Sequence, residues 1–215
     1  VRGLPTLGGL EDTQIERLVA LKPDVVLAAS SIRAIDRLEA LGLRVLALEA
    51  KGFADVPRVI DTVAQALGEP AAGAALWQRQ QARMAAAAAR VPPALRGRKV
   101  YLEAASPSYA AGESSFVGEV LARLGLANVV PASQGPFPKL NPEFVVRAQP
   151  QLVMGSARAV AEMPQRPGWA ALAALRDQQT CGFEAPVWDT LVRAGPRLAD
   201  AAEAIADCLV KLPAR

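Results

Sequence analysis

Apolar residues recur along the chain at helical spacing and then in short continuous runs, and one such combination occurs twice. The copies are residues 16–29 (ERLVALKPDVVLAA) and 143–156 (EFVVRAQPQLVMGS). At a constant offset Glu16 aligns with Glu143, and the prolines of the two copies coincide. Each copy predicts a short helix, a proline break and an apolar strand covered on both faces. The repeat therefore predicts two α/β lobes built alike, with a cleft between them.

The amino-terminal part of the chain predicts βαβ wiring and a parallel sheet. Thr13 and Glu16 have the spacing of a capping box, which predicts a helix over 13–21. The strand, helix and strand that follow are predicted over 24–29, 32–41 and 44–48. The first strand ends at Ser30 and Ser31, small polar residues where open α/β sheets place their ligand loops.

The middle of the chain is helical in pattern. A helix over 56–67 stops at Gly68, and a longer one over 70–90 ends before Pro92 and Pro93. This long helix is expected to act as a rigid strut between two lobes. The predicted organisation is a remainder of an amino-terminal lobe (1–55), a helical region (56–96) and a carboxyl-terminal lobe (97–215).

The last part of the chain again alternates strands and helices. Strands are predicted over 99–102 and 152–154 and within 181–187. Helices are predicted over 116–124, near 169–175 and over 196–212, and another begins at Asn141, a cap followed by Pro142. The intervening loops are expected over 104–114, 130–140 and 188–195.

The amino-acid composition excludes several classes of function. More than half of the residues are apolar, the net charge is only +3 and basic residues are not interleaved with aromatics, which argues against nucleic-acid binding. The sequence contains no histidine, which removes Ser/His/Asp triads and most zinc sites. It also lacks the glycine-rich phosphate motifs of nucleotide-binding enzymes. These exclusions disfavour a doubly wound α/β enzyme, and no catalytic residue is predicted.

The two cysteines, Cys181 and Cys208, fall on the predicted last strand and last helix. These elements should pack together, so one disulfide suits an oxidising compartment, and two buried free thiols are the alternative.

Four side chains outside the repeat are candidates for binding. Tyr109 and Phe137 lie in loops rich in proline and glycine, which favours exposed aromatic walls over core positions. Asp189 and Arg193 are four residues apart in a predicted loop. They are interpreted as site residues, with a plain surface ion pair as the alternative.

Several segments resemble class III periplasmic substrate-binding proteins, which serve ABC importers of cobalamin, haem and ferric siderophores. The first-lobe signature is matched by Gly8-Gly9 and by residues 15–28. The second-lobe signatures are matched by Tyr109 to Gly112 with Ser115-Phe116, and by residues 195–201. Family members carry further amino-terminal strands, so the resemblance implies a first lobe that is truncated here.

The resemblance implies a non-enzymatic binding protein without a cofactor or metal, and cobalamin binders match best. By position, Asp189 and Arg193 hydrogen-bond the amide side chains of the corrin, and Tyr109 and Phe137 line its pocket. Ser30 and Ser31 are expected at the cleft. Haem or a ferric siderophore is the alternative ligand, with Tyr109 available as an axial ligand to haem iron. A receptor-like module with an empty cleft is a further alternative.

The resemblance also implies a partner. In this family one glutamate on each lobe pairs with arginines of the transporter's membrane subunits, and by motif position these are Glu16 and Glu143. Such charges mainly steer association and set register, and first-turn capping is the alternative role for both. The family implies a monomer in the periplasm, with an export signal outside this chain and lipid anchoring left open.

Overall fold

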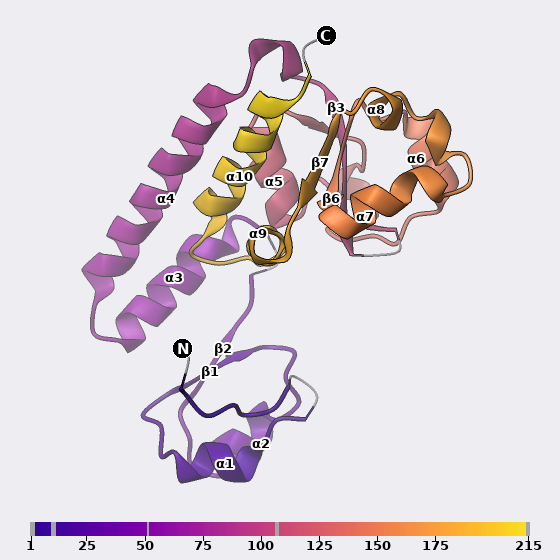
Figure 1. Cartoon of the computed structure of the whole chain (residues 1–215). Coiled ribbons are helices and arrows are strands. Elements are labelled where there is room, and N and C mark those ends of the chain that lie inside the picture. Colours follow the sequence, from indigo (N-terminus) through magenta and orange to yellow (C-terminus); the bar gives the residue numbers. More distant parts are fainter. Residues whose placement is uncertain (1–2, 10–11, 51, 106–107, 214–215) are drawn as a thin grey trace. The chain divides into compact units, whose positions relative to one another are not determined.

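The computed structural model describes residues 3–9, 12–50, 52–105 and 108–213, which belong to two compact units (Figure 1). The first unit is Val1–Glu49 and the second is Ala50–Arg215. Both combine helices with parallel strands, which confirms the predicted α/β class.

The first unit is a small parallel βαβ unit. Its elements are α1 (Ile15–Ala20), β1 (Val26–Ala29), α2 (Ile35–Ala40) and β2 (Val45–Leu48). The strands pair in parallel with Val26 opposite Val45, and the helices bury Ile15, Leu18 and Leu38. The prediction that β1 is covered on both faces is wrong for this unit, since Leu27 is 49% exposed.

The predicted capping box at the start of α1 is also wrong. Gln14 occupies the position before the helix, and its side chain makes no capping hydrogen bond. The Thr13 hydroxyl instead donates to the Gly9 carbonyl at 3.2 Å, so it is used by the preceding turn. Glu16 lies 3.7 Å from Arg37 of α2, across the surface of the unit.

The second unit is built on a five-stranded sheet. Its strands are β3 (Lys99–Ala105), β4 (Tyr109–Ala110), β5 (Ala127–Asn128), β6 (Leu152–Ser156) and β7 (Thr180–Phe183). The parallel strands run in the order β5-β3-β6-β7, and β4 pairs antiparallel with β3.

Helices cover both faces of this sheet (Figure 1). One face carries α3 (Asp55–Ala66), α4 (Pro70–Arg90), α5 (Phe116–Arg123), α9 (Ala185–Leu191) and α10 (Leu198–Lys211). The other carries α6 (Pro142–Ala148), α7 (Ala157–Glu162), α8 (Ala173–Arg176) and the 3-10 turns η3 (Met163–Gln165) and η4 (Trp169–Ala171). Two further 3-10 turns are η1 (Pro93–Leu95) and η2 (Ala132–Gln134).

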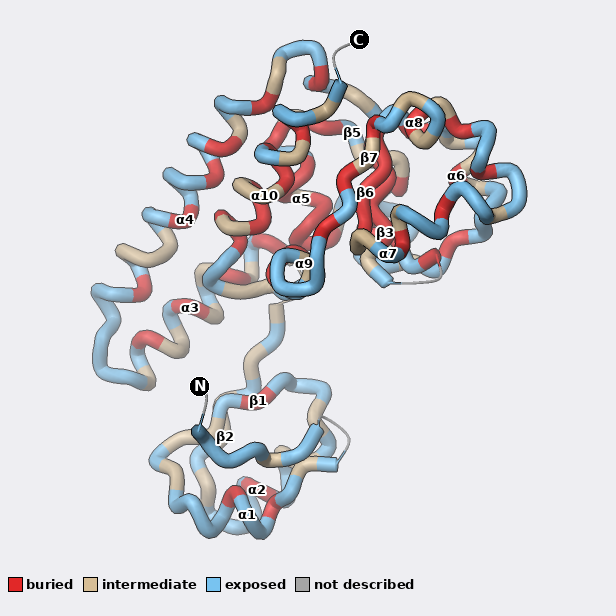
Figure 2. The backbone as a smooth tube through the Cα atoms, in the orientation of Figure 1, coloured by how far each residue is buried: buried red, intermediate tan, exposed pale blue. Residues whose placement is uncertain are grey.

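Side chains of the central strands point alternately to the two faces of the sheet and so contribute to both cores. On β3, Leu102 packs on the α10 side and Tyr101 on the α6 side; on β6, Met154 and Val153 divide in the same way. Because side chains of a strand point alternately to opposite faces, a continuous apolar run serves a sheet covered on both sides. Figure 2 shows these strands as the most deeply buried part of the unit. The predicted two-sided burial is therefore confirmed for the second copy of the repeat.

Helix α4 packs lengthwise against α3 and α10 within the second unit (Figure 1). The buried amide oxygen of Gln80 accepts from the Ala199 N–H at 2.9 Å and so satisfies a backbone donor in the first turn of α10. Further along, Arg83 pairs with Asp200 and Glu203 at 2.7 and 2.6 Å. These polar contacts fix the register of the two helices.

Cys181 of β7 and Cys208 of α10 form a disulfide, with their Cα atoms 5.9 Å apart. The predicted pairing is therefore confirmed, and the alternative of two free thiols is excluded. The bond ties the last helix to the last strand of the sheet.

Two loop predictions and one helix prediction are wrong in part. Residues 188–191, the first part of the loop predicted over 188–195, belong to helix α9, and the predicted loop over 104–114 contains β4. The helix expected near 169–175 is split into η4 and α8, because Leu172 between them is extended. Strand β5 was not predicted, since two residues are too short to show a period.

Replacing Gly118 of α5 with Ala should destabilise the second unit. A Cβ at this position would clash with the Gly112 carbonyl oxygen, which is backbone and cannot rotate away. Overpacking of this kind costs on the order of 1–3 kcal/mol, to be measured by denaturant unfolding. Gly195→Ala is the matched control, because nothing lies within 4 Å of the position that its methyl group would take. Equal stability of the two variants would contradict the expected clash.

Candidate functional site

The candidate site is built on a ribbon formed by β4 and the loop that precedes α6. The Ala110 N–H donates to the Pro138 carbonyl at 3.0 Å, and the Leu140 N–H donates to the Ser108 carbonyl at 2.9 Å. This pattern places Tyr109 directly opposite Lys139 in antiparallel register. Two segments that sequence analysis treated as separate loops are therefore one paired structure.

Prolines and glycines explain the shape of this ribbon. Pro136 and Pro138 have no N–H, so each only accepts a hydrogen bond, from Gly112 (2.9 Å) and from Ala110. A Cβ on Gly112 would clash with the Gly135 carbonyl oxygen, so the close approach of the two segments requires glycine. The prolines and glycines from which loops were predicted thus allow the two backbone segments to pack closely.

The ribbon presents two aromatic rings and an ammonium group. Residues opposite one another share a face, so the register places Tyr109 and Lys139 on the same face, and Phe137 lies two residues before Lys139. Tyr109 is 41% and Phe137 37% exposed. The Lys139 ammonium lies 5.9 Å from the Tyr109 ring centre, and Phe137 rests against the buried Phe116 ring at 5.6 Å. The result is an exposed aromatic surface supported from below.

A buried ion pair lies beneath the ribbon and was missed by sequence analysis. Glu103 of β3 is 1% exposed, and its oxygens accept two hydrogen bonds from Arg166 at 2.5 and 2.8 Å. In the β3–β4 pairing Glu103 lies opposite Ala110, next to Tyr109. A single carboxylate within an otherwise apolar strand was the available signal, because a buried charge requires a partner.

Tyr101 extends this cluster. Its hydroxyl donates to Glu103 at 3.1 Å, and its ring packs edge-on against Trp169. Burial, followed by the neighbouring Glu103 charge, raises the pKa of Tyr101, so the hydroxyl stays protonated and remains a donor. The hydrogen bonds to Glu103 raise the pKa of Arg166. The cluster thus joins β3 to the segment between α7 and α8.

Asp189 lies on helix α9, so the loop context predicted for it is wrong, whereas Arg193 lies in the loop between α9 and α10, as predicted. Their charged groups are 3.8 Å apart, and the side chains are 58% and 70% exposed. A surface ion pair of this kind is worth roughly 0–1 kcal/mol. Within the described residues, no hydrogen bond or ion pair joins either side chain to the Tyr109 ribbon.

Ser30 and Ser31 belong to the first unit and follow β1, as predicted. The Ser30 N–H donates to the Leu48 carbonyl at 3.2 Å and extends the strand pairing by one residue. Ser31 lines a hollow of about 270 Å³ in the same unit, together with Thr13 and Arg33. Ser31 thus lies in a polar depression at the end of a strand, and Ser30 precedes it.

Glu16 and Glu143 each lie in the first turn of a short helix, one in each unit. The Glu16 side chain is 83% exposed, and Glu143 is also exposed. The Asn141 side chain accepts from the Glu143 N–H at 2.9 Å, which confirms Asn141 as the cap of α6. Both carboxylates are exposed, and each has one weak contact within its own unit: Glu16 with Arg37, and Glu143 with the Asn141 side-chain amide, which donates to it at 3.4 Å.

The described residues contain no group of three or more side chains arranged to hold a metal ion. Among the same residues, no helix is long and apolar enough to cross a membrane.

Comparison with known proteins identifies the family. Residues 3–182 match the model of a periplasmic binding protein family, and the chain belongs to this family. It is 31% identical over 159 residues to the vitamin B12-binding protein of Salmonella typhi, covering 67% of this chain and 56% of the relative. It is 29% identical over 157 residues to a cobalamin-binding protein of Halobacterium salinarum, covering 71% of this chain and 42% of that protein. The chain thus spans about half the length of these curated relatives.

Solved structures show the same fold. A periplasmic haem-binding protein with two haems bound is 28% identical, with a TM-score of 0.78 over 98% of this chain and 84% of that one. The periplasmic vitamin B12-binding protein of Vibrio cholerae is 22% identical, with a TM-score of 0.73 over 96% and 81% of the two chains. The predicted fold class and the family resemblance are therefore both confirmed.

Replacing Arg166 should lower the free energy of unfolding of the second unit. Arg166→Met leaves the Glu103 carboxylate buried without its cation, and breaking one side of such a pair costs about 3–5 kcal/mol. The double variant Glu103→Leu/Arg166→Met should lose clearly less stability, because no buried charge remains. Chemical denaturation of both variants checks this. A double variant as unstable as the single one would show that the pair is not the source of the loss.

Proposed function

We propose that this member of the periplasmic binding protein family is the substrate-binding component of an ABC importer and that its ligand is cobalamin. Two relatives named for vitamin B12 or cobalamin support the ligand. The observation that carries the proposal is the exposed aromatic face of Tyr109 and Phe137, held on a rigid ribbon. Binding sites for large organic ligands combine such apolar walls with a few orienting polar groups.

Each proposed contact has a defined role. The rings of Tyr109 and Phe137 pack against the apolar surface of the corrin. Asp189 and Arg193 are exposed and already paired, so they exchange a surface ion pair for hydrogen bonds to the amide side chains of the ligand. Ser30 and Ser31 are proposed as hydroxyl donors to the ligand. The protein acts by binding alone, and the location that follows from this role is the periplasm, either free or lipid-anchored.

Haem is the second candidate ligand. The haem-binding structure is 28% identical and matches nearly the whole chain. Tyr109 has an exposed ring on a fixed backbone, so its phenol is available as an axial ligand to haem iron. The two ligands differ in what they require of this residue: the corrin needs the ring, whereas haem iron needs the hydroxyl oxygen.

Tyr109 variants separate the two ligands. Tyr109→Phe keeps the ring, so cobalamin affinity should change less than about threefold, whereas Tyr109→Ala should weaken it about threefold to tenfold. Phe137→Ala should weaken it to a similar extent. Absorbance and calorimetric titrations with cyanocobalamin and haem measure both affinities. Loss of haem binding in Tyr109→Phe, with no cyanocobalamin binding to the unmodified chain, would favour haem. Binding of neither ligand would overturn the proposal.

Glu16 and Glu143 are proposed as the docking carboxylates for the membrane subunits of the importer. Each is exposed, each lies in the first turn of a helix in a different unit, and the two occupy equivalent positions of the repeat. Glu16 lies within 3.7 Å of Arg37, an exposed contact that a transporter arginine can replace at little cost. Two such charges give the interface its register.

Replacing both carboxylates should abolish docking and leave ligand binding unchanged. For Glu16→Gln/Glu143→Gln, binding to the importer in nanodiscs should weaken at least about tenfold, since two ion pairs are lost. Calorimetry with the ligand should give the same affinity as the unmodified chain. Glu39→Gln/Glu162→Gln, which removes an exposed helix carboxylate from each unit, is the control. Undiminished docking, or reduced ligand affinity, would contradict the assigned role.

A further inference from the structure

A hollow of the second unit lies beside strand β5, away from the Tyr109 ribbon. Its volume is about 570 Å³. Its walls are mostly apolar and come from β5, the residue that follows it, and α6: Ala127, Val129, Phe144 and Ala148. Lys99 and Ala127 begin β3 and β5, so the hollow reaches the amino ends of the parallel strands, whereas Tyr109 follows the carboxyl end of β3. It is therefore separate from the proposed ligand site.

The floor of the hollow contains an open strand edge. Among the described strands, β5 pairs only with β3. The N–H groups of Ala127 and Val129 donate to the Arg98 and Val100 carbonyls of that neighbour, both at 3.0 Å. Residues of a parallel strand alternate in the direction of their backbone groups, so the N–H and C=O of Asn128 point away from β3. One donor and one acceptor are thus presented to the hollow.

Two cationic side chains contribute to the lining of the hollow. Lys99 and Arg147 both line the hollow and both are exposed. Neither makes an ion pair with a carboxylate among the described residues, in contrast to Arg83, Arg158 and Arg166. The Asn128 side chain bonds the Ala111 carbonyl and the Val130 N–H, so it does not compete for a ligand here. The hollow therefore combines apolar walls, a backbone donor–acceptor pair and positive charge.

We propose that this hollow binds an extended peptide segment of a partner protein, one with an acidic residue between apolar residues. The peptide lies along β5 and exchanges two backbone hydrogen bonds with Asn128. Its apolar side chains rest on Val129 and Phe144, and its carboxylate is bound between Lys99 and Arg147. Main-chain bonds at a sheet edge give such binding its affinity, and the pockets and charges give its specificity. The site is independent of the ligand carried by the protein.

Peptide titrations followed by ¹H–¹⁵N NMR on the whole chain test this proposal. The probe is Ac-Thr-Val-Glu-Val-Thr-NH2, which should shift the amide signals of Asn128, Val129 and Arg147 in a saturable way. Replacing the probe's glutamate with lysine should weaken binding about tenfold, because two charge contacts become repulsive. N-methylation of the probe backbone should abolish binding, because the edge hydrogen bonds are lost.

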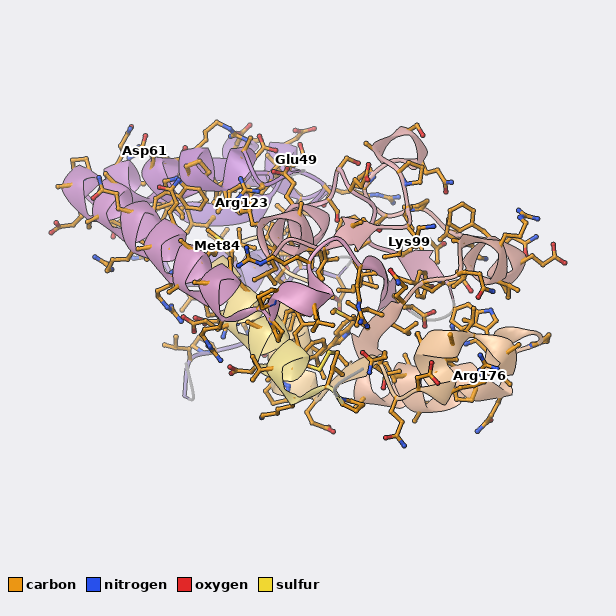
Figure 3. All side chains as sticks on the ribbon, turned by 90° about the horizontal axis from the view of Figure 1, so that it is seen from above. Glu49, Asp61, Met84, Lys99, Arg123 and Arg176 are labelled. Carbon is orange, nitrogen blue, oxygen red and sulfur yellow. A yellow bond between two sulfur atoms is a disulfide. The ribbon has the colours of Figure 1, made fainter. Side chains whose placement is uncertain are left out.

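Protein variants locate the site. Lys99→Glu and Arg147→Glu should each weaken binding of the acidic probe. Arg176 of α8 is another exposed cation, in a different part of the unit (Figure 3), so Arg176→Glu should leave this binding unchanged. Unchanged unfolding curves confirm that these surface variants are folded. The proposal is overturned if the signals do not shift, if they shift elsewhere, or if the N-methylated probe or sodium acetate alone produces the same shifts. The last result would identify a site for small carboxylates.

Discussion

The burial of one parallel sheet on both faces is the constraint on which the larger unit depends. Strands β3 and β6 send alternate side chains into two separate cores, so neither face tolerates water and both require helices. This explains why helices from distant parts of the chain converge on the sheet. It also explains the cross-links that hold the last helix: Gln80 and Arg83 fix α10 on α4, and the disulfide fixes it on β7.

The same constraint makes Glu103 exceptional. A carboxylate on a strand covered from both sides has no access to water, and Arg166 and Tyr101 supply the hydrogen bonds that water would make. Since β4 pairs with β3 at this residue, the buried cluster and the exposed Tyr109 are neighbours in one backbone arrangement. The glycines and prolines of the two adjoining segments complete it. The buried cluster and the exposed rings are the features on which the proposed ligand site is based.

Family membership and residue roles rest on different kinds of support. The family model and the solved relatives cover most of the chain and agree on the fold. A fold shared by binders of several ligands does not select among them, so the ligand depends on the chemistry of the site. Here the aromatic ribbon, the exposed pair on α9 and the two helix-initial glutamates are the residues on which the proposed function depends.

The sequence by itself determined the α/β class, the parallel strands, the long helix α4, the Asn141 cap and the elements joined by the disulfide. These follow from local periodicity, caps and breakers, which act within a few residues. It misassigned Thr13, β4 and α9, where short segments carry little periodic signal and nearby contacts decide the outcome. Only the tertiary structure paired Tyr109 with Lys139, placed Arg166 on Glu103 and left the edge of β5 open. Each of these depends on which segments far apart in the chain come together, and local patterns do not encode that.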